Sequence, residues 1–534
     1  MPTLDSWLRS LLRGDDRLAA LKADAERGAK AGRTQASEYE ACVAPYIRCR
    51  DGLLFGTTEL PERRIHEVRL AARIAQGSSG WVTGATGSGK TRGLLALALQ
   101  DFATPHTTCI AADFKGDLAE GLIEAVIPWL ATQLPPEQGA ELLHGLRVWA
   151  PWNSDRLPSM HLTFPGGSLR RRAIAIAELF VATIAAGEFG HRQQSLLLPC
   201  LRLMIATGTP LALLGEVLNS AALRDSLIDL ARDAELTSYF RDRFPADSRE
   251  GVAFSILSRF DRFISDESTR LALFGEDPFD PAEWLESGAT VCDFGGGLGT
   301  HQRFWAAAIL HGLTTAILSR RVTRESPRVV VRVDEVQVGI ASQDQARELE
   351  NTLSLMRSRR ASLWVAHQHA GQLAEHPALL QSLRTNTGVQ VAFRSPRETT
   401  SAMATVLPDQ VLPGILRHDV TEAQMRQAWE IALAALPERV FLLRCPELSP
   451  IGIPVRTPVV DLDSMRRQSL PEARFLARQG ARSYSKADLA KRERLWRQLA
   501  AELGRAATPN SDALARAVAP RTTTPSRPRR VEVG

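Results

Sequence analysis

The chain has 534 residues, of which 44% are hydrophobic and 23% are charged. This composition can form a large core, and it excludes a collagen-like, wholly disordered or disulfide-scaffold protein. The six cysteines are scattered without a CxxC pair, which argues against a zinc site, and a formal net charge of +5 predicts no strong preference of the whole chain for nucleic acid.

The beginning of the chain is polar and helix-prone, and we predict that residues 1–60 form an accessory segment. It contains no uninterrupted apolar stretch, so a signal peptide is not predicted. The best candidate for a membrane span, residues 196–215, contains Pro199, Arg202 and Pro210 and fits a pair of buried helices better. We therefore expect a cytoplasmic protein without a transmembrane segment.

From residue 61 onward, short apolar runs alternate with amphipathic stretches, which is typical of a parallel sheet with crossover helices. The predicted strands are Trp81–Gly84, Thr108–Asp113, Leu146–Ala150, Thr290–Phe294, Val329–Asp334, Ser362–Ala366, Val389–Phe393 and Val440–Leu443. Between residues 166 and 284 apolar residues recur at helical spacing instead. The sequence thus predicts an α/β domain, residues 61–165 and 285–460, interrupted by an inserted all-α domain, residues 166–284.

A glycine-rich phosphate loop follows the first predicted strand. It has the full GxxxxGK[ST] pattern, formed by Gly84, Ala85, Thr86, Gly87, Ser88, Gly89, Lys90 and Thr91. The strand before it and the helical pattern after it are the context that this motif requires. Backbone N–H groups of such a loop, and the N-terminus of the next helix, bind phosphate oxygens. We expect Lys90 to neutralise the β- and γ-phosphates of ATP and the Thr91 hydroxyl to hold Mg²⁺.

A lysine at a strand end is informative in this chain, which has only six lysines but 59 arginines. Lys115 follows the strand that ends at Asp113 and precedes Asp117. A solvated cluster of these charges is one interpretation. The other is a ligand contact at the C-terminal edge of the sheet, where open α/β sheets bind ligands.

Residues 329–335, VVVRVDE, form a β-branched run that ends in two acids, as in a Walker B strand. Asp334 would hold Mg²⁺ through water, and Glu335 would polarise the attacking water. An ordinary solvated turn is the alternative. Kinase-like P-loop proteins usually lack the second acid, so its presence favours a motor or a hydrolase. Lys90 and Asp334 are 244 positions apart, which independently supports a large insertion.

The C-terminal part, residues 461–534, is predicted to be a basic tail that is partly helical and partly disordered. Residues 464–534 carry a net charge of +10, whereas the rest of the chain carries −5. A solvated helix with a flexible end is one interpretation. The other is an electrostatic tether to DNA phosphates or to an anionic membrane.

These motifs, in this order, resemble the coupling ATPases of type IV secretion and conjugation systems, which belong to the FtsK–HerA class of P-loop translocases. The resemblance covers roughly residues 60–450. The sequences that carry it are GATGSGKT, DFKGD, PWNSDRLP (151–158), CDFGGGLG (292–299), VRVDE, RSRRASLWVAHQHAGQL (357–373) and LRTNTGVQVAFR (383–394). The resemblance implies a RecA-like P-loop NTPase domain with a mostly parallel sheet and an inserted all-α domain. Coupling proteins usually carry N-terminal transmembrane helices, and this sequence shows none.

The resemblance also assigns roles to single residues. Gln368, just after the strand 362–366, matches the glutamine that senses the γ-phosphate or the attacking water, although a surface polar residue is the alternative. Its neighbours His367 and His369 are predicted to be polar surface residues. Lys90, Thr91, Asp334 and Glu335 are implied to serve nucleotide and Mg²⁺ chemistry, and Lys115 matches a further element of the class.

Arg357 ends a predicted helix, residues 342–356, and lies eleven positions before Gln368. The same offset resembles the coupling-protein pattern and implies that Arg357 reaches the ATP of the neighbouring subunit in a ring. An arginine suits this role because its planar fork binds phosphate oxygens bidentately. Arg359 and Arg360 are close rivals.

The resemblance implies an ATP-driven DNA translocase that works as a homo-oligomer, expected to be a hexamer, with DNA and a secretion-system or relaxase partner. Peripheral docking on a membrane partner would replace the missing membrane helices. The inserted domain is expected at one rim of the ring, where it selects the substrate or partner. The alternatives are a HerA-like motor that acts with a nuclease in repair or defence, and a P-loop switch or scaffold that does not translocate.

Overall fold

The computed structural model describes most of the chain in ten stretches: 43–59, 65–152, 156–162, 168–184, 190–248, 251–277, 279–295, 299–396, 421–480 and 483–505. The chain forms two compact units. One combines Met1–Trp152 with Pro281–Ser483, and the other combines Asn153–Asp280 with Tyr484–Gly534. Residues 506–534 and parts of the PWNSDRLP and CDFGGGLG motifs lie outside the described residues.

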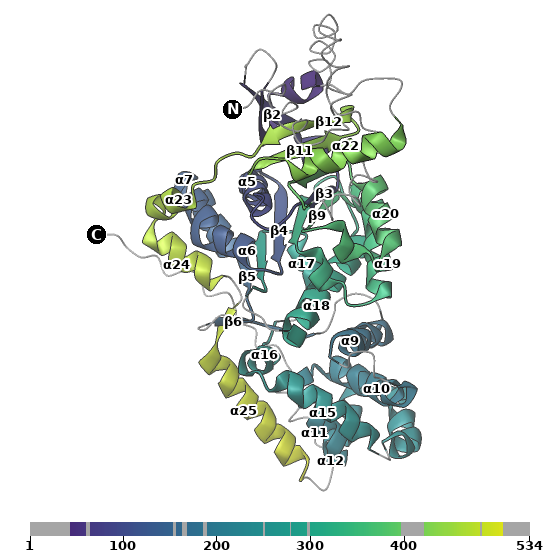
Figure 1. Cartoon of the computed structure of the whole chain (residues 1–534). Coiled ribbons are helices and arrows are strands. Elements are labelled where there is room, and N and C mark those ends of the chain that lie inside the picture. Colours follow the sequence, from purple (N-terminus) through teal and green to yellow (C-terminus); the bar gives the residue numbers. More distant parts are fainter. Residues whose placement is uncertain are drawn as a thin grey trace, which may run out of the picture. The chain divides into compact units, whose positions relative to one another are not determined.

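The first unit is built on an 11-stranded sheet with the order β2-β1-β12-β11-β10-β3-β9-β8-β4-β7-β5 (Figure 1). The strands are β1 (Gly52–Glu59), β2 (Ile65–Ala71), β3 (Gly80–Thr83), β4 (Thr107–Asp113), β5 (Leu146–Trp149), β7 (Ala289–Asp293), β8 (Arg328–Asp334), β9 (Ala361–His367), β10 (Val389–Phe393), β11 (Val440–Cys445) and β12 (Ser449–Arg456). The neighbours from β10 to β5 run parallel, whereas β11, β12, β1 and β2 pair antiparallel.

The predicted α/β class with a mostly parallel sheet is confirmed, and every predicted strand coincides with an observed one to within two residues. The central strands β8 and β9 are buried almost throughout. Strands that are covered on both faces need apolar side chains at every position, which explains why their runs are continuous and easy to recognise.

Three strands of this sheet were not predicted, and all three lie in its antiparallel part. β2 (IHEVRLA) alternates charged and apolar residues, and β12 (SPIGIPVR) contains two prolines. A search for continuous apolar runs therefore misses them. β1 falls within the segment that was predicted to be accessory, so the sheet begins earlier in the chain than expected.

Helices cover both faces of the sheet: α5–α7, α23 and α24 lie on one face, and α18–α20 lie on the other (Figure 1). The helices of this unit are α4 (Ala72–Ala75), α5 (Lys90–Phe102), α6 (Asp117–Gly121), α7 (Ile127–Gln133), α8 (Pro136–Gly145), α17 (Pro281–Trp284), α18 (Gly299–Ser319), α19 (Gln343–Leu355), α20 (Pro377–Asn386), α22 (Glu422–Ala434), α23 (Leu462–Gln468) and α24 (Pro471–Gln479). Short 3₁₀ or π turns add η1 (Leu122–Val126), η4 (Val336–Gly339), η5 (Met356–Arg359) and η6 (Ala370–Leu373).

The second unit is helical apart from the short strand pair β6 (Arg156–Pro158) and β13 (Ser483–Ser485). Its helices are α9 (Leu169–Thr183), α10 (His191–Thr207), α11 (Leu214–Asn219), α12 (Ala221–Ala231), α13 (Ala234–Ser238), α14 (Phe244–Asp247), α15 (Val252–Ile264), α16 (Glu267–Ala272) and α25 (Lys486–Leu503), with the turns η2 (Leu211–Leu213) and η3 (Tyr239–Arg243). Helix α15 buries Val252, Ile256, Phe260 and Phe263, which share one face at helical spacing.

The described part of the predicted tail packs onto both units. Helices α23 and α24 belong to the first unit, and α25 belongs to the helical unit. There α25 buries Leu489, Trp496 and Leu503, and its Glu493 accepts from Arg270 at 2.7 Å. This partition differs from the predicted division, in which residues 461–534 formed one separate segment.

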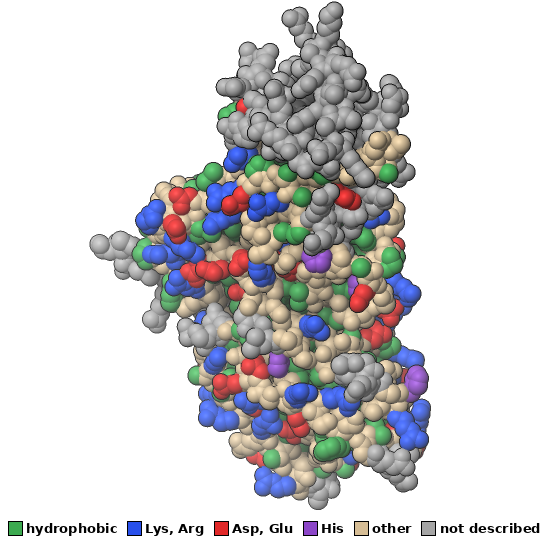
Figure 2. Space-filling model, in the orientation of Figure 1, with side chains coloured by type: hydrophobic (Ala, Val, Ile, Leu, Met, Phe, Trp, Pro, Cys, Tyr) green, Lys and Arg blue, Asp and Glu red, His purple; other side chains and the backbone are tan. Residues whose placement is uncertain are grey.

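Several basic residues of this region are paired within the folded units. Arg466 and Arg478 of the first unit form ion pairs with Glu120 and Glu124. In Figure 2, basic and acidic side chains are interspersed over the visible surface of the described residues. Acids of the folded units therefore neutralise part of the positive charge of this segment.

None of the described helices is long and apolar enough to cross a bilayer. The apolar span 196–215 is divided between α10, which ends at Thr207, and the elements that begin at Leu211. Helix α10 packs against α9, so its apolar face contributes to the core of the helical unit.

Candidate functional site

The phosphate loop connects β3 to α5 at the C-terminal edge of the parallel strands. Two of its glycines are required by the local geometry. Gly89 has φ +103°, and a Cβ there would lie 3.0 Å from the Cα of Arg439. A Cβ on Gly84 would lie 2.5 Å from the Cβ of Phe393. The loop can therefore take this tight path only with glycine at these positions.

The loop presents hydrogen-bond donors that the protein itself does not use. No side chain caps the N-terminus of α5, whose first N–H groups have no intrahelical acceptor. The Ser88 hydroxyl is fully buried and has no partner among the described residues. Donors at a helix N-terminus, reinforced by the helix dipole, are suited to bind an anion such as phosphate.

Lys90 is held between the two acids that end β8. Its Nζ lies 3.0 Å from Asp334 Oδ1 and 3.0 Å from Glu335 Oε1, and its side chain is only 6% exposed. Burial acts to lower the pKa of Lys90, but the two carboxylates raise it above its usual value. Lys90 is thus charged at neutral pH. It bridges Asp334 and Glu335, which lie 244 and 245 positions further along the chain.

The two acids experience different environments. Burial raises the pKa of Asp334 above its usual range, despite Lys90. For Glu335, burial also acts to raise the pKa, but the Lys90 charge and several hydrogen bonds outweigh it and lower the pKa. Glu335 also has φ +56°, a left-handed conformation that is strained for a residue other than glycine. Such strain is often found at functional positions.

Two glutamines hold the Glu335 carboxylate. Gln368 Nε2 donates to Oε1 at 3.0 Å, and Gln337 Nε2 donates to Oε2 at 2.6 Å. The structure therefore brings Gln368 into the same cluster as Lys90 and Glu335. Gln337 was not predicted; its only sequence signal is its position two residues after the acidic pair.

His367 lies in the interior, so its prediction as a polar surface residue is wrong. It is fully buried, and its Nε2 accepts from Trp81 Nε1 at 2.7 Å. Burial lowers the pKa of His367 to about 4, which keeps the ring neutral. The Trp81–His367 pair links the ends of β3 and β9, directly before the phosphate loop and Gln368.

Lys115 lies at the same edge of the sheet but outside this cluster. Its ammonium group pairs with Asp117 at 3.2 Å and is 41% exposed. Asp113 is buried and accepts from the backbone N–H groups of Lys115, Leu118 and Ala119, so it caps the start of α6. Asp113 is also the register partner of Asp334, which places this loop beside the two acids.

Arg357 is not brought together with the other predicted residues. It lies in η5, before β9 begins, whereas Gln368 follows the end of β9. Seven extended residues span about 20 Å, so Arg357 and Gln368 lie at opposite edges of the sheet. Arg357 donates to Ser78 Oγ at 3.3 Å. Its rivals Arg359 and Arg360 donate to backbone carbonyls.

No protein-family model matches the chain, and no curated protein matches it. Solved structures do match. The plasmid coupling protein TrwB in complex with the non-hydrolysable ATP analogue ADPNP has 17% identity and a TM-score of 0.50, with 74% of this chain and 88% of TrwB covered. TrwB in complex with ADP and Mg²⁺ has 16% identity and a TM-score of 0.50, with 75% and 90% covered.

At this level of identity the similarity shows a shared fold. The chain therefore has the fold of a coupling-protein P-loop ATPase, as the sequence motifs predicted.

Proposed function

We propose that this protein is an ATPase of the coupling-protein type, which hydrolyses ATP in a ring to move DNA or a DNA–protein substrate. One observation carries the proposal: a buried cluster of Lys90, Asp334 and Glu335, joined by the half-buried Gln368, lies beside a phosphate loop with unused donors. The TrwB structures with an ATP analogue and with ADP and Mg²⁺ support nucleotide binding by the same fold.

The residues at this site fit a magnesium nucleotide. Thr91, in the first turn of α5, and the carboxylate of Asp334 supply the hard oxygen ligands that Mg²⁺ prefers. A bound Mg²⁺ would neutralise charge on the phosphates. The backbone N–H groups of Gly84, Ala85 and Ser88 donate to carbonyl oxygens of the chain, so those of Thr86, Gly87 and Gly89 would bind the phosphate oxygens. Lys115 at the same edge would lie within reach of the bound ligand.

Glu335 is suited to polarise the attacking water. Its lowered pKa keeps it ionised, and the amides of Gln337 and Gln368 fix its two oxygens. Lys90 Nζ lies 3.0 Å from Glu335 Oε1. The γ-phosphate would attract the Lys90 ammonium, and Glu335 Oε1 would then accept a hydrogen bond from water. The neighbouring Gln368 amide would sense whether the γ-phosphate is present.

The ring is proposed from the resemblance to the coupling ATPases and from the place of Arg357. Among the described residues, Lys90 forms ion pairs with Asp334 and Glu335, and no arginine forms an ion pair with these two acids, although the backbone of Arg439 lies beside Gly89. Arg357, at the far edge of the sheet, could reach only the nucleotide of a neighbouring subunit. Head-to-tail contacts of this kind close into rings, and a hexamer is the proposed form.

The substrate and the setting complete the proposal. The motor would act in the cytoplasm on DNA, docked on a secretion-system, relaxase or membrane partner, and the helical unit would select that partner. The test is the ATPase rate of the purified chain with and without DNA, with Lys90→Ala as the control. A motor is stimulated by DNA. A slow rate that DNA leaves unchanged would instead favour the switch or scaffold.

A further inference from the structure

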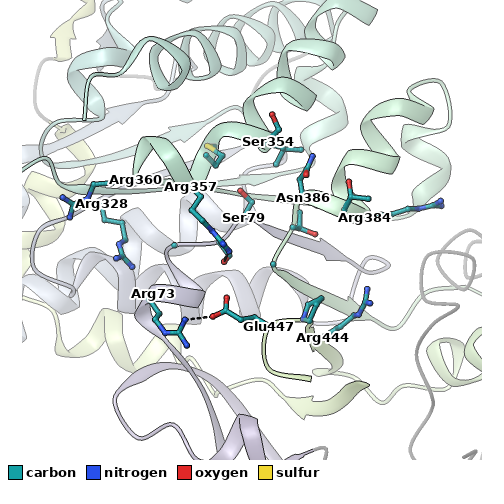
Figure 3. A pocket seen from close by; sticks show the side chains of 18 residues that line it. Arg73, Ser79, Arg328, Ser354, Arg357, Arg360, Arg384, Asn386, Arg444 and Glu447 are labelled. Atoms are coloured by element: carbon teal, nitrogen blue, oxygen red, sulfur yellow. Dashed lines mark hydrogen bonds and ion pairs between the residues drawn. The ribbon is translucent and has the colours of Figure 1, made fainter. Parts of the chain in front are cut away.

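A cavity of about 940 Å³ opens at the edge of the sheet opposite the phosphate loop, where β3, β8, β9 and β10 begin (Figure 3). Six arginines and one glutamate provide its charged lining: Arg73, Arg328, Arg357, Arg360, Arg384, Arg444 and Glu447. We call this cavity with its six arginines the arginine pocket. Figure 3 shows Arg357 extending into it, with Arg73, Arg328 and Arg360 on one side and Arg384 and Arg444 on the other.

Most of the positive charge in the arginine pocket is not neutralised by acids. Glu447 forms an ion pair with Arg73. Among the described residues, Arg328, Arg357, Arg360 and Arg384 donate only to neutral oxygens: those of Ala72, Ser78, Thr323, Arg324 and Gln381. Burial lowers the pKa of Arg328, and the charge of Arg360 lowers it further. The charges of Arg328 and Arg360 are therefore close enough to repel each other, and neither side chain donates to an acid of the described chain.

A structural role explains only part of this arrangement. Arg384 lies in the last turn of α20, and Arg357 follows the end of α19, so both can stabilise the negative end of a helix dipole. That argument does not apply to Arg328, which begins a strand. It also leaves the Nε of Arg384 buried without a partner among the described residues.

We propose that the arginine pocket binds the phosphate groups of a polyphosphate ligand of nucleotide size. Arginine forks bind phosphate oxygens bidentately, and a polyphosphate concentrates several negative charges within one cavity. The volume lies in the range of small-molecule and cofactor sites. Single-stranded nucleic acid carries one charge per nucleotide, so it requires an extended groove rather than one pocket. Ser79, Asn386 and Thr387 add polar groups to the lining.

This site is separate from the phosphate loop, and the same chemistry can come from two sources. One is a free nucleotide in solution. The other is the nucleotide held by the phosphate loop of a second copy. In that case Arg328 and Arg360 would contact the nucleotide of the second copy together with Arg357. The second source rests on the proposed function, whereas the binding of polyphosphate itself does not.

The test is calorimetric titration of the full chain with inorganic tripolyphosphate, using Lys90→Ala to weaken the phosphate loop. Tripolyphosphate should bind the Lys90→Ala variant. When Arg328→Gln and Arg360→Gln are added to this variant, the affinity for tripolyphosphate should fall at least about tenfold, because each of the two substitutions removes a charged hydrogen-bond donor. Arg347→Gln is the matched control, because Arg347 is 74% exposed on the neighbouring α19. Arg360→Gln alone, at an exposed position, should weaken binding several-fold, which covers the case in which the double change disturbs folding.

Equal affinities of the pocket variants and the Arg347 control would overturn the proposal, as would the absence of tripolyphosphate binding. Pocket-dependent binding of a DNA oligonucleotide but not of tripolyphosphate would also contradict it.

Titration of the wild-type chain with ATP distinguishes the two sources of polyphosphate. If ATP fills two sites per chain, the source is free nucleotide. If ATP fills one site and Arg328→Gln lowers turnover only in assembled protein, the source is the second copy. A chain without ATPase activity would contradict the proposed function and leave this test intact.

Discussion

At the C-terminal edge of the parallel strands, Lys90 is buried between Asp334 and Glu335. At the N-terminal edge of the same strands, six arginines surround an open cavity that has one glutamate. At the C-terminal edge the charge of Lys90 is neutralised by the two acids, whereas at the N-terminal edge most of the arginines have no acid partner among the described residues. An internally paired cluster has its groups positioned before any ligand arrives, whereas unpaired arginines need an anion from outside.

The two edges would also respond differently to a change of conditions. The pairs of Lys90 are shielded from salt by burial, but Arg357 and Arg360 are exposed and subject to screening. Arginine stays charged at every accessible pH, so the arginine pocket cannot titrate, whereas the acids and His367 can. We therefore propose that nucleotide binding and water activation take place at the first edge and that the second edge binds a further anion.

The largest effect is expected for Lys90→Ala. It removes the cation that would contact the phosphates and leaves two buried carboxylates without a counter-ion. We expect ATP hydrolysis to fall by about 10³-fold or more and ATP binding to weaken, as measured by turnover and by nucleotide titration. Normal turnover in a clean preparation would contradict the assignment of the whole site.

The next effect is expected for Glu335→Gln. The amide keeps the shape of the side chain but cannot accept the proton of water, so turnover should fall about 10²- to 10⁴-fold while ATP binding is retained. Glu348→Gln, on α19 and outside the cluster, is the control. If Glu335→Gln loses ATP binding but bound ATP still turns over normally, the role of Glu335 is positional rather than chemical.

A smaller effect is expected for Gln368→Ala. It removes the donor to Glu335 Oε1, and hydrogen bonds to charged groups contribute about 1.5–3 kcal/mol. We expect kcat to fall about 10- to 100-fold, and the acid limb of the pH profile to move to higher pH, because the ionised form of Glu335 loses a donor. Gln138→Ala, at an exposed position on α8, is the control. An unchanged pH profile would show that Gln368 does not act through Glu335.

The smallest effect concerns stability. The pKa of His367 is about 4 in the folded chain, below the ordinary value of 6.5, because the buried ring resists protonation. As pH falls from 6.5 to 4, the unfolded chain takes up a proton that the folded chain does not, so stability should fall by up to about 3 kcal/mol. The free energy of unfolding of His367→Gln, measured with urea, should depend less on pH than that of the wild-type chain. The control His144→Gln, at an exposed position, should keep the pH dependence of the wild-type chain. Equal slopes for all three proteins would contradict this account of His367.

The phosphate-loop edge was largely predictable from the sequence because its residues belong to short motifs at strand ends. Parallel strands align their carboxyl ends, so Lys90, Asp334 and Gln368 had to lie near one another once the strands were recognised. Gln337 and the buried state of His367 were missed because no local pattern distinguishes them from surface residues.

The arginine pocket was not predictable. Its arginines come from five separate stretches of the chain, around residues 73, 328, 357, 384 and 444. In a sequence with 59 arginines, no single one stands out. The parallel sheet aligns the starts of β3, β8, β9 and β10, and α4 and the antiparallel β11 bring Arg73 and Arg444 to the same cavity.

The central claim is that Arg357, at the N-terminal edge of the parallel strands, completes the nucleotide site at the C-terminal edge of the sheet in a neighbouring subunit. The most direct test is the ATPase rate of mixed assemblies of Arg357→Ala and Glu335→Gln. Arg357→Ala alone should bind ATP and assemble, yet hydrolyse very slowly, since related arginines contribute about 10³–10⁵ in rate.

In a mixed assembly, an Arg357→Ala subunit keeps Glu335 and can receive Arg357 from its Glu335→Gln neighbour. The account predicts activity above that of either variant alone. Mixtures of Lys90→Ala with Glu335→Gln are the control, because both changes damage the same edge and should restore nothing. Mixed assemblies that form, but show no activity above either variant, would contradict the claim that the two edges act together.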